Sequence, residues 1–123
     1  MSTLNFGDFL LRPKCLGISH VGVWLGGGRV FHNAPARGEH ISSVEEFAQG
    51  ETVTVKATNA DAASVSVRVH SRLSAPQPYD VLSNNCEHTA NHVVTGKAFS
   101  PQLMAGVAVL VALVFTYLAV RKR

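Results

Sequence analysis

The sequence predicts an α+β fold in which a small antiparallel β-sheet packs against helices, followed by one C-terminal transmembrane helix. Three observations predict it. Residues 17–32 have the pattern of a β-hairpin, residues 84–96 have that of a capped helix, and residues 103–120 form an apolar run without a charge. The chain of 123 residues has the length of a single domain, so we expect one functional site.

The hairpin is predicted from β-branched and aromatic residues on both sides of a turn. It spans residues 17–32 and turns at three consecutive glycines, residues 26–28. A turn centred on the first two of these glycines places His32 opposite Val21 and beside His20, within about one residue of register. The two imidazoles are therefore expected to be neighbours.

A short helix and another strand are expected after the hairpin. Residues 33–35, Asn-Ala-Pro, form a chain-breaking turn. Ser42 and Glu45 then fit a capping box and Gly50 fits a helix terminator, which predicts a helix between them. Residues 51–57 alternate between polar and apolar side chains and predict a strand.

Residues 61–73 fit two patterns. Val65, Val67 and Val69 alternate with polar residues, as in a strand, whereas Val65, Val69 and Leu73 recur at helical spacing. The residues alone slightly favour a strand.

A second helix is expected after a proline-containing loop. Asn84 or Asn85 can cap its start and Gly96 can end it, which places Cys86 in its first turn. A thiol in that position faces unsatisfied backbone N–H groups and the positive end of the helix dipole, both of which favour the thiolate.

Cys86, His20 and His32 are the candidate catalytic residues. A histidine could accept the thiol proton or form an ion pair with the thiolate, and a second polar group could orient that histidine. The hairpin histidines could fill both roles, although the residues alone leave open that all three are core or surface residues. A zinc site that adds Cys15 is another alternative, but the spacings follow no compact ligand pattern. We therefore expect no metal and no other cofactor.

Three motifs resemble those of the lecithin–retinol acyltransferase (LRAT) family. The segment HVGVWLGGGRVFHNAP, residues 20–35, resembles the H-box, and residues 85–88 match the NCEH signature. Upstream, Gly7 and Asp8 resemble the opening PGD element. The resemblance covers roughly residues 5–100.

The resemblance implies a circularly permuted relative of papain-like and NlpC-type cysteine hydrolases. It implies that Cys86 is the nucleophile, His20 the general base and His32 the third, orienting member. It also implies that residues 61–73 are helical, and we adopt the helix there.

The implied activity is that of a thiol acyltransferase or phospholipase A. The substrate would be an acyl ester of a membrane glycerophospholipid, and the acyl group would pass through a thioester on Cys86. Two alternatives keep the motifs: an NlpC-type peptidase or amidase, and a membrane-tethered interaction module without catalysis.

The sequence departs from the family pattern at two positions near the site. Relatives commonly have Phe after NCEH, where this chain has Thr89, and Tyr two residues before the first histidine, where this chain has Ile18. Any contribution of that tyrosine to oxyanion stabilisation is therefore absent, and the backbone N–H of Cys86 is the donor that can be named.

The apolar run at residues 103–120 predicts a membrane anchor. Eighteen helical residues span roughly 27 Å, close to the hydrocarbon thickness of a bilayer, about 30 Å. Tyr117 and the basic residues 121–123 can reach the headgroup layer at its far end. The alternative is a buried core helix. The predicted organisation is a head in residues 1–100, this anchor, and the basic end.

Charge is distributed in the same way as hydrophobicity. Residues 1–102 carry eight basic and eight acidic side chains, so the net charge of +3 comes from residues 121–123. A neutral head gives no support for nucleic-acid binding. Residues 1–14 lack the pattern of a secretory signal, so we expect a cytosolic head and free thiols at Cys15 and Cys86. The positive-inside tendency favours the opposite placement.

Overall fold

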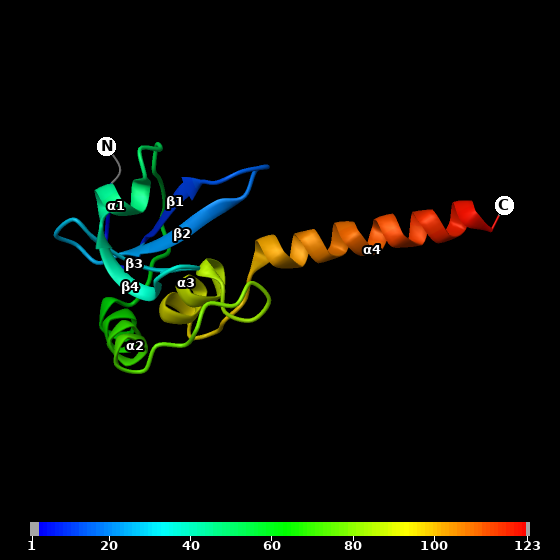
Figure 1. Ribbon diagram of the computed structural model, residues 1–123. Coiled ribbons are helices and arrows are strands. Elements are labelled where there is room, and N and C mark those ends of the chain that lie inside the picture. The colour runs from blue at the N-terminus through cyan, green and yellow to red at the C-terminus, as the bar shows by residue number, and fades with distance from the viewer. Residues whose placement is uncertain (1–2, 123) are drawn as a thin grey trace.

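The computed structural model describes residues 3–122, which form a head with a five-stranded antiparallel sheet and a long C-terminal helix (Figure 1). The strand order is β4-β3-β2-β1-β5. The predicted α+β class is confirmed. The strands are β1 (Phe9–Pro13), β2 (Ser19–Trp24), β3 (Arg29–Ala34), β4 (Gly38–Ser43) and β5 (Thr54–Lys56), and the helices are α1 (Val44–Ala48), α2 (Ala62–Ser74), α3 (Cys86–Thr95) and α4 (Pro101–Arg121).

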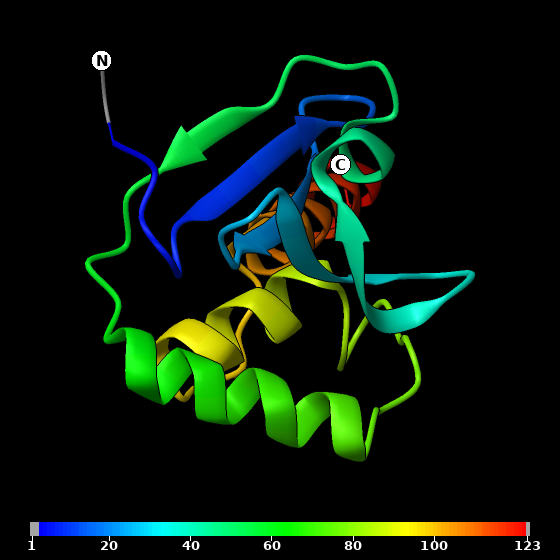
Figure 2. The same cartoon turned by 90° about the vertical axis from the view of Figure 1, so that its left-hand side faces the viewer.

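The two faces of the sheet are covered by different helices. Figure 2 shows α2 and α3 side by side across one face. The alternation of β2 turns Val21 and Val23 to that face, where they form a cluster with Val65 of α2 and Val93 of α3. The opposite face, which carries His20 and His32, is covered by Phe47 of α1. The histidines therefore lie inside the head.

The hairpin pairs β2 with β3 in the register expected from the turn, within the stated error. His32 lies opposite Gly22, one residue from the expected partner. A Cβ added to Gly22 would lie 2.5 Å from Val30 Cγ1 and 2.7 Å from Phe47 Cε2. Glycine at this position allows Phe47 to approach the strand next to His20.

Three sheet elements differ from the prediction. The strands β1 and β4 were not predicted, because neither shows a clean alternation and β1 ends in a proline. These two strands form because β1 pairs with β2 and β4 pairs with β3, and such pairing between segments cannot be read from the local pattern. Strand β5 is shorter than the predicted strand over residues 51–57.

The prediction that Ser42 caps the short helix was wrong. Ser43 is the cap, because its hydroxyl accepts a hydrogen bond from the backbone N–H of Glu46 at 3.1 Å. Ser42 remains in β4, where it is paired with Val30. The helix ends near Gly50, as predicted.

Residues 62–74 form helix α2, so the slight preference for a strand was wrong and the helix implied by the family resemblance is confirmed. Asp61 caps the helix by accepting a hydrogen bond from Ser64 N at 3.1 Å. Val65 and Val69 are buried one turn apart, whereas Val67 is exposed. The alternation of valine with polar residues did not reflect alternating burial.

Helix α3 has the predicted limits. The Asn85 side chain accepts hydrogen bonds from Glu87 N and His88 N, and His88 Nδ1 accepts one from Asn85 N. Gly96 ends the helix in the left-handed conformation. Cys86 is the first residue of α3, as expected.

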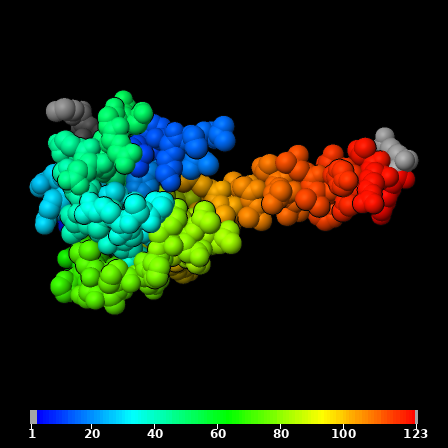
Figure 3. All heavy atoms as spheres, in the orientation of Figure 1, coloured from blue at the N-terminus to red at the C-terminus, as the bar shows by residue number. Residues whose placement is uncertain are grey.

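Helix α4 begins at a Ser100 cap and projects away from the head beyond its first turns (Figures 1 and 3). It is long and apolar enough to cross a membrane, and none of its residues is buried. The alternative of a buried core helix is therefore excluded. Arg123, the last residue of the predicted basic end, lies outside the described residues.

Candidate active site

His20 and His32 form a buried pair on neighbouring strands. His20 Nε2 lies 2.8 Å from His32 Nδ1, and the ring centroids are 5.1 Å apart. His20 is 1% exposed. The expected contact between the two imidazoles is confirmed.

Ser42 extends the histidine pair into a chain of contacts that ends on the backbone of β4. Its hydroxyl donates to the carbonyl oxygen of Ser43 at 3.0 Å, and its oxygen lies 2.8 Å from His32 Nε2. If the single hydroxyl proton is on the bond to the Ser43 carbonyl, His32 Nε2–H is the donor to Ser42 and His32 Nδ1 is an acceptor. His20 donates its Nε2–H to that acceptor. The lone pair of neutral His20 is consequently on Nδ1.

Aromatic packing and burial keep both histidines uncharged. The Phe47 ring stacks on His20 at 5.3 Å between centroids and meets His32 edge-on at 5.1 Å. Desolvation by burial, followed by the positive charge of Arg12, lowers the pKa of His20 to about 3. Desolvation and the neighbouring His20 lower the pKa of His32 to about 3. Both imidazoles are therefore neutral at physiological pH.

Cys86 is buried, and its burial shifts the pKa of the thiol in the opposite direction to the one expected from the helix N-terminus. Burial raises the pKa of the Cys86 thiol, and the backbone of Val21 and the charge of Lys14 oppose this rise without overcoming it. The expectation that the helix N-terminus favours the thiolate is not met, because desolvation of the anion outweighs the local N–H groups. The proton stays on sulfur in the resting protein. Neither Cys15 nor Cys86 is in a disulfide, as expected.

The packing of α3 on β2 places Cys86 beside the strand that carries His20. The backbone of Val21, the residue after His20, acts directly on the thiol. His20 Nδ1 is buried and has no hydrogen-bond partner within residues 3–122. An unpartnered buried polar atom is uncommon in a folded protein, and His20 Nδ1 shares this condition with a few other buried atoms such as Asn33 Oδ1.

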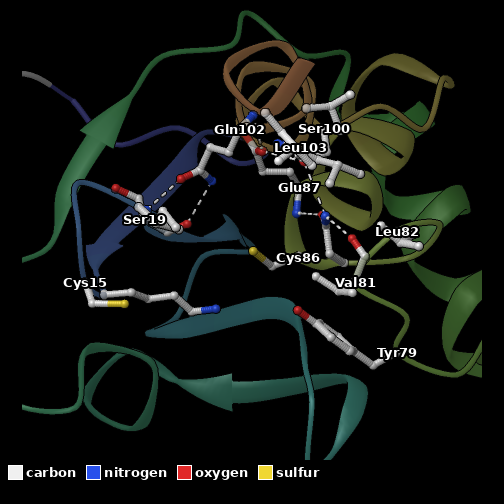
Figure 4. A pocket seen from close by; sticks show the side chains of 16 residues that line it. Cys15, Ser19, Tyr79, Val81, Leu82, Cys86, Glu87, Ser100, Gln102 and Leu103 are labelled. Carbon is white, nitrogen blue, oxygen red and sulfur yellow. Dashed lines mark hydrogen bonds between the residues drawn. The ribbon is translucent and has the colours of Figure 1, made fainter. Parts of the chain in front are cut away.

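Cys86 also borders a cavity of about 530 Å³ between the head and the start of α4 (Figure 4). Tyr79 directs its hydroxyl into this cavity on the side of Cys86. Burial raises the pKa of Tyr79, and the charge of a Cys86 thiolate raises it further. The phenol is therefore a protonated hydrogen-bond donor next to the thiol.

Sequence reasoning missed four residues around the site: Ser42, His40, Tyr79 and Lys14. If β4 had been recognised as a strand, Ser42 and His40 would have been identified. They alternate along β4 onto the same face of the sheet as His32 of the neighbouring strand β3. His40 lies 4.2 Å from His32 between ring centroids. No local pattern indicates that Tyr79 and Lys14 meet at Cys86, since only the tertiary fold brings them together.

A buried polar network lies on the α2 and α3 side of the sheet. Arg72 Nη2 and Glu39 Oε1 form an ion pair at 2.7 Å. Thr89 donates to the same carboxylate oxygen at 3.1 Å, and Arg72 donates to Asn84 Oδ1 at 3.0 Å. Thr89, one of the two departures from the family pattern, is thus a fully buried partner of Glu39. The network joins β4, α2 and the residue before the α3 cap.

Residues 2–99 match the family model described as lecithin retinol acyltransferase. The matched segment contains His20, His32 and Cys86 and ends just before α4. No curated protein shows a significant match to the chain.

Proposed function

The chain belongs to the lecithin retinol acyltransferase family, and on that premise we propose that it is a thiol acyltransferase or phospholipase A that acts on membrane glycerophospholipids. Membership supports an acyl-transfer enzyme at the level of the family. The unpartnered Nδ1 of buried His20, beside the strand residue that contacts the Cys86 thiol, carries the proposal for this chain.

In the proposed reaction, Cys86 attacks an ester carbonyl of the lipid as a neutral thiol assisted by a base. Its sulfur forms the bond to carbon while the thiol proton moves to His20 Nδ1. The protonated His20 then gives that proton to the leaving alcohol oxygen, which leaves a fatty acyl thioester. Water, an amine or an alcohol attacks the thioester with His20 again as base, and this step restores the thiol.

His32 and Ser42 are positioning residues in this scheme. His32 Nδ1 accepts the His20 Nε2–H, which leaves His20 Nδ1 as the basic nitrogen of this pair and stabilises the imidazolium that forms in the proposed reaction. Ser42 holds His32 in the tautomer that this requires. Because the pKa of the thiol is raised and that of His20 is lowered, proton transfer accompanies attack instead of preceding it.

We assign the oxyanion of the tetrahedral intermediate to two donors. The backbone N–H of Cys86 donates no hydrogen bond within the part of the chain that the structure describes, and it is at the start of α3. The Tyr79 hydroxyl is the second donor. It supplies from the loop before α3 what a tyrosine in the place of Ile18 would supply from the residue before β2.

The variant Tyr79→Phe is therefore expected to lower kcat for acyl release by about 10²-fold with little change in KM, because it removes one donor to the oxyanion. Steady-state kinetics on phosphatidylcholine vesicles measure this. The matched control is Tyr117→Phe, which removes the same hydroxyl from the exposed far part of α4. Equal kcat values for the two variants would contradict the role of Tyr79.

We also propose that α4 holds the head at a membrane. Its 21 residues span about 31 Å, and Tyr117, Arg121 and Lys122 lie toward its far end. In this arrangement residues 1–100 are the catalytic head, on the cytosolic side, and residues 103–120 are the anchor.

The experiment that tests the proposed function is capture of the thioester. The full chain in phosphatidylcholine vesicles is quenched with acid, digested and analysed by mass spectrometry. A fatty acyl mass on the peptide that contains Cys86 is expected, together with released lysophospholipid. The adduct is expected to be absent in Cys86→Ala and present in Cys15→Ala.

Acyl release that is equal in Cys86→Ala and the unsubstituted protein would contradict the proposal. A peptidyl adduct on Cys86 with peptide substrates, without any fatty acyl adduct, would favour the amidase alternative. The absence of both adducts in the folded protein would favour the non-catalytic module.

A further inference from the structure

One wall of the cavity at Cys86 belongs to the helix that could cross a membrane. The lining residues Leu103, Gly106, Val107 and Leu110 stand at positions i, i+3, i+4 and i+7, so they lie on one face of α4. Figure 4 shows Leu103 at the edge of the cavity nearest to Glu87. The cavity therefore runs from the thiol along an apolar stripe of α4.

The start of α4 is fixed to the site by two polar attachments. The Gln102 side chain accepts a hydrogen bond from Ser19 N at 2.7 Å and donates one to Ser19 O at 2.9 Å, so it binds the backbone of the residue before His20. Glu87, the residue after Cys86, accepts hydrogen bonds from Ser100 Oγ at 2.7 Å and Gln102 N at 2.8 Å. These contacts set the position of the α4 wall relative to both His20 and Cys86.

We propose that this groove between α4 and Cys86 binds the fatty acyl chain of the lipid substrate. The proposal rests on the proposed function and adds the binding site for the acyl chain. The chain leaves the bilayer core along the Leu103–Leu110 face of α4 and brings its ester carbonyl to the Cys86 thiol.

The hydrophobic effect favours this route over one through water. Each methylene group exposed to water loses the stabilisation that it has in the bilayer, so withdrawal of a chain of about 16 carbons through water would be strongly unfavourable. A groove that is continuous with a membrane-spanning helix avoids most of this cost. At the other end, Lys14 lines the cavity beside Cys86, where a cation suits the phosphate that lies a few bonds from the ester.

Gly106 offers a direct test, because a Cβ at this position meets no atom within 4 Å. A larger side chain would therefore start from an uncrowded position and extend into the groove that Gly106 lines. The variant Gly106→Phe is expected to lower kcat/KM at least tenfold for a phosphatidylcholine with 16-carbon chains. It is expected to change kcat/KM less than twofold for one with four-carbon chains, which do not reach Gly106.

The matched control is Ala108→Phe, since residue 108 lies about 200° further around the helix and is exposed. This variant is expected to stay within twofold of the unsubstituted protein on both lipids. Circular dichroism establishes that both variants keep the fold.

The outcomes separate this inference from the proposed function. If Gly106→Phe and Ala108→Phe have the same activity on the long-chain lipid while the unsubstituted protein is active, the acyl groove is refuted and the proposed function stands. If the folded unsubstituted protein releases no acyl group from either lipid, both are refuted.

Discussion

The variant His20→Gln is expected to lower kcat/KM for acyl release by about 10²- to 10⁴-fold, the usual contribution of a general base. Glutamine can fill much of the space between β2 and Phe47, but it has no basic nitrogen to accept the thiol proton. Initial rates on phosphatidylcholine vesicles measure the loss. The matched control is His70→Gln, on the exposed side of α2, which is expected to keep full activity.

The pH dependence of the unsubstituted protein tests the same role of His20. A histidine with the ordinary pKa of about 6.5 would lose about tenfold of its basic form between pH 7.5 and 5.5. The pKa of His20 is about 3, so its base form persists through this range and kcat/KM is expected to fall less than twofold. A tenfold fall with an intact fold would contradict the neutral, desolvated His20.

Circular dichroism at each pH is needed because the same pKa values govern stability. The unfolded chain protonates its histidines below about pH 6.5, whereas His20 and His32 stay neutral in the folded head until about pH 3. The unfolded state binds more protons in this window, so the free energy of unfolding falls as the pH falls. A loss of activity that coincides with unfolding reports stability and not the base.

The features of the site that could be predicted from the sequence are those encoded by neighbouring residues. The glycines at 26–28 set the hairpin and its register, which brought His20 beside His32 to within one residue of the observed pairing. Asn85 and Gly96 are cap residues with local hydrogen bonds, so they placed Cys86 at the start of α3.

The features that could not be predicted depend on packing between distant segments. The helix N-terminus alone favours a thiolate, but the sheet, Tyr79 and the start of α4 bury the Cys86 sulfur and raise the pKa of the thiol. Strand β4 forms because it pairs with β3 along its whole length, so Ser42 became a partner of His32 where a helix cap was expected. Residues 61–73 could not be assigned from the sequence alone, because their valines fit both the alternation of a strand and the spacing of a helix.

The second large effect is expected from the ion pair between Glu39 and Arg72. The Glu39 side chain is fully buried and that of Arg72 is 10% exposed. The variant Arg72→Met is expected to lower the free energy of unfolding by about 3–5 kcal/mol, because it leaves the Glu39 carboxylate buried without its cation. Urea unfolding of the full chain in detergent micelles, followed by the fluorescence of Trp24, the single tryptophan, measures the change.

The chain provides a matched control in Arg37, which meets Glu46 at 3.4 Å with both side chains more than half exposed. The variant Arg37→Met removes the same chemical group and is expected to cost less than about 1 kcal/mol, since exposed pairs contribute little. Equal losses for the two arginine variants would contradict a special role of the buried pair.

A double variant separates the unpaired charge from lost packing. Combined with Arg72→Met, the substitution Glu39→Gln removes the buried charge while its amide can still accept the hydrogen bond from Thr89. The double variant is therefore expected to be more stable than Arg72→Met alone. If it is not, the loss comes from the packing of the arginine side chain.

The rate of acyl release is expected to follow the same order as stability among these variants. Arg72 donates a hydrogen bond to Asn84, and the next residue, Asn85, caps α3 and so sets the position of Cys86.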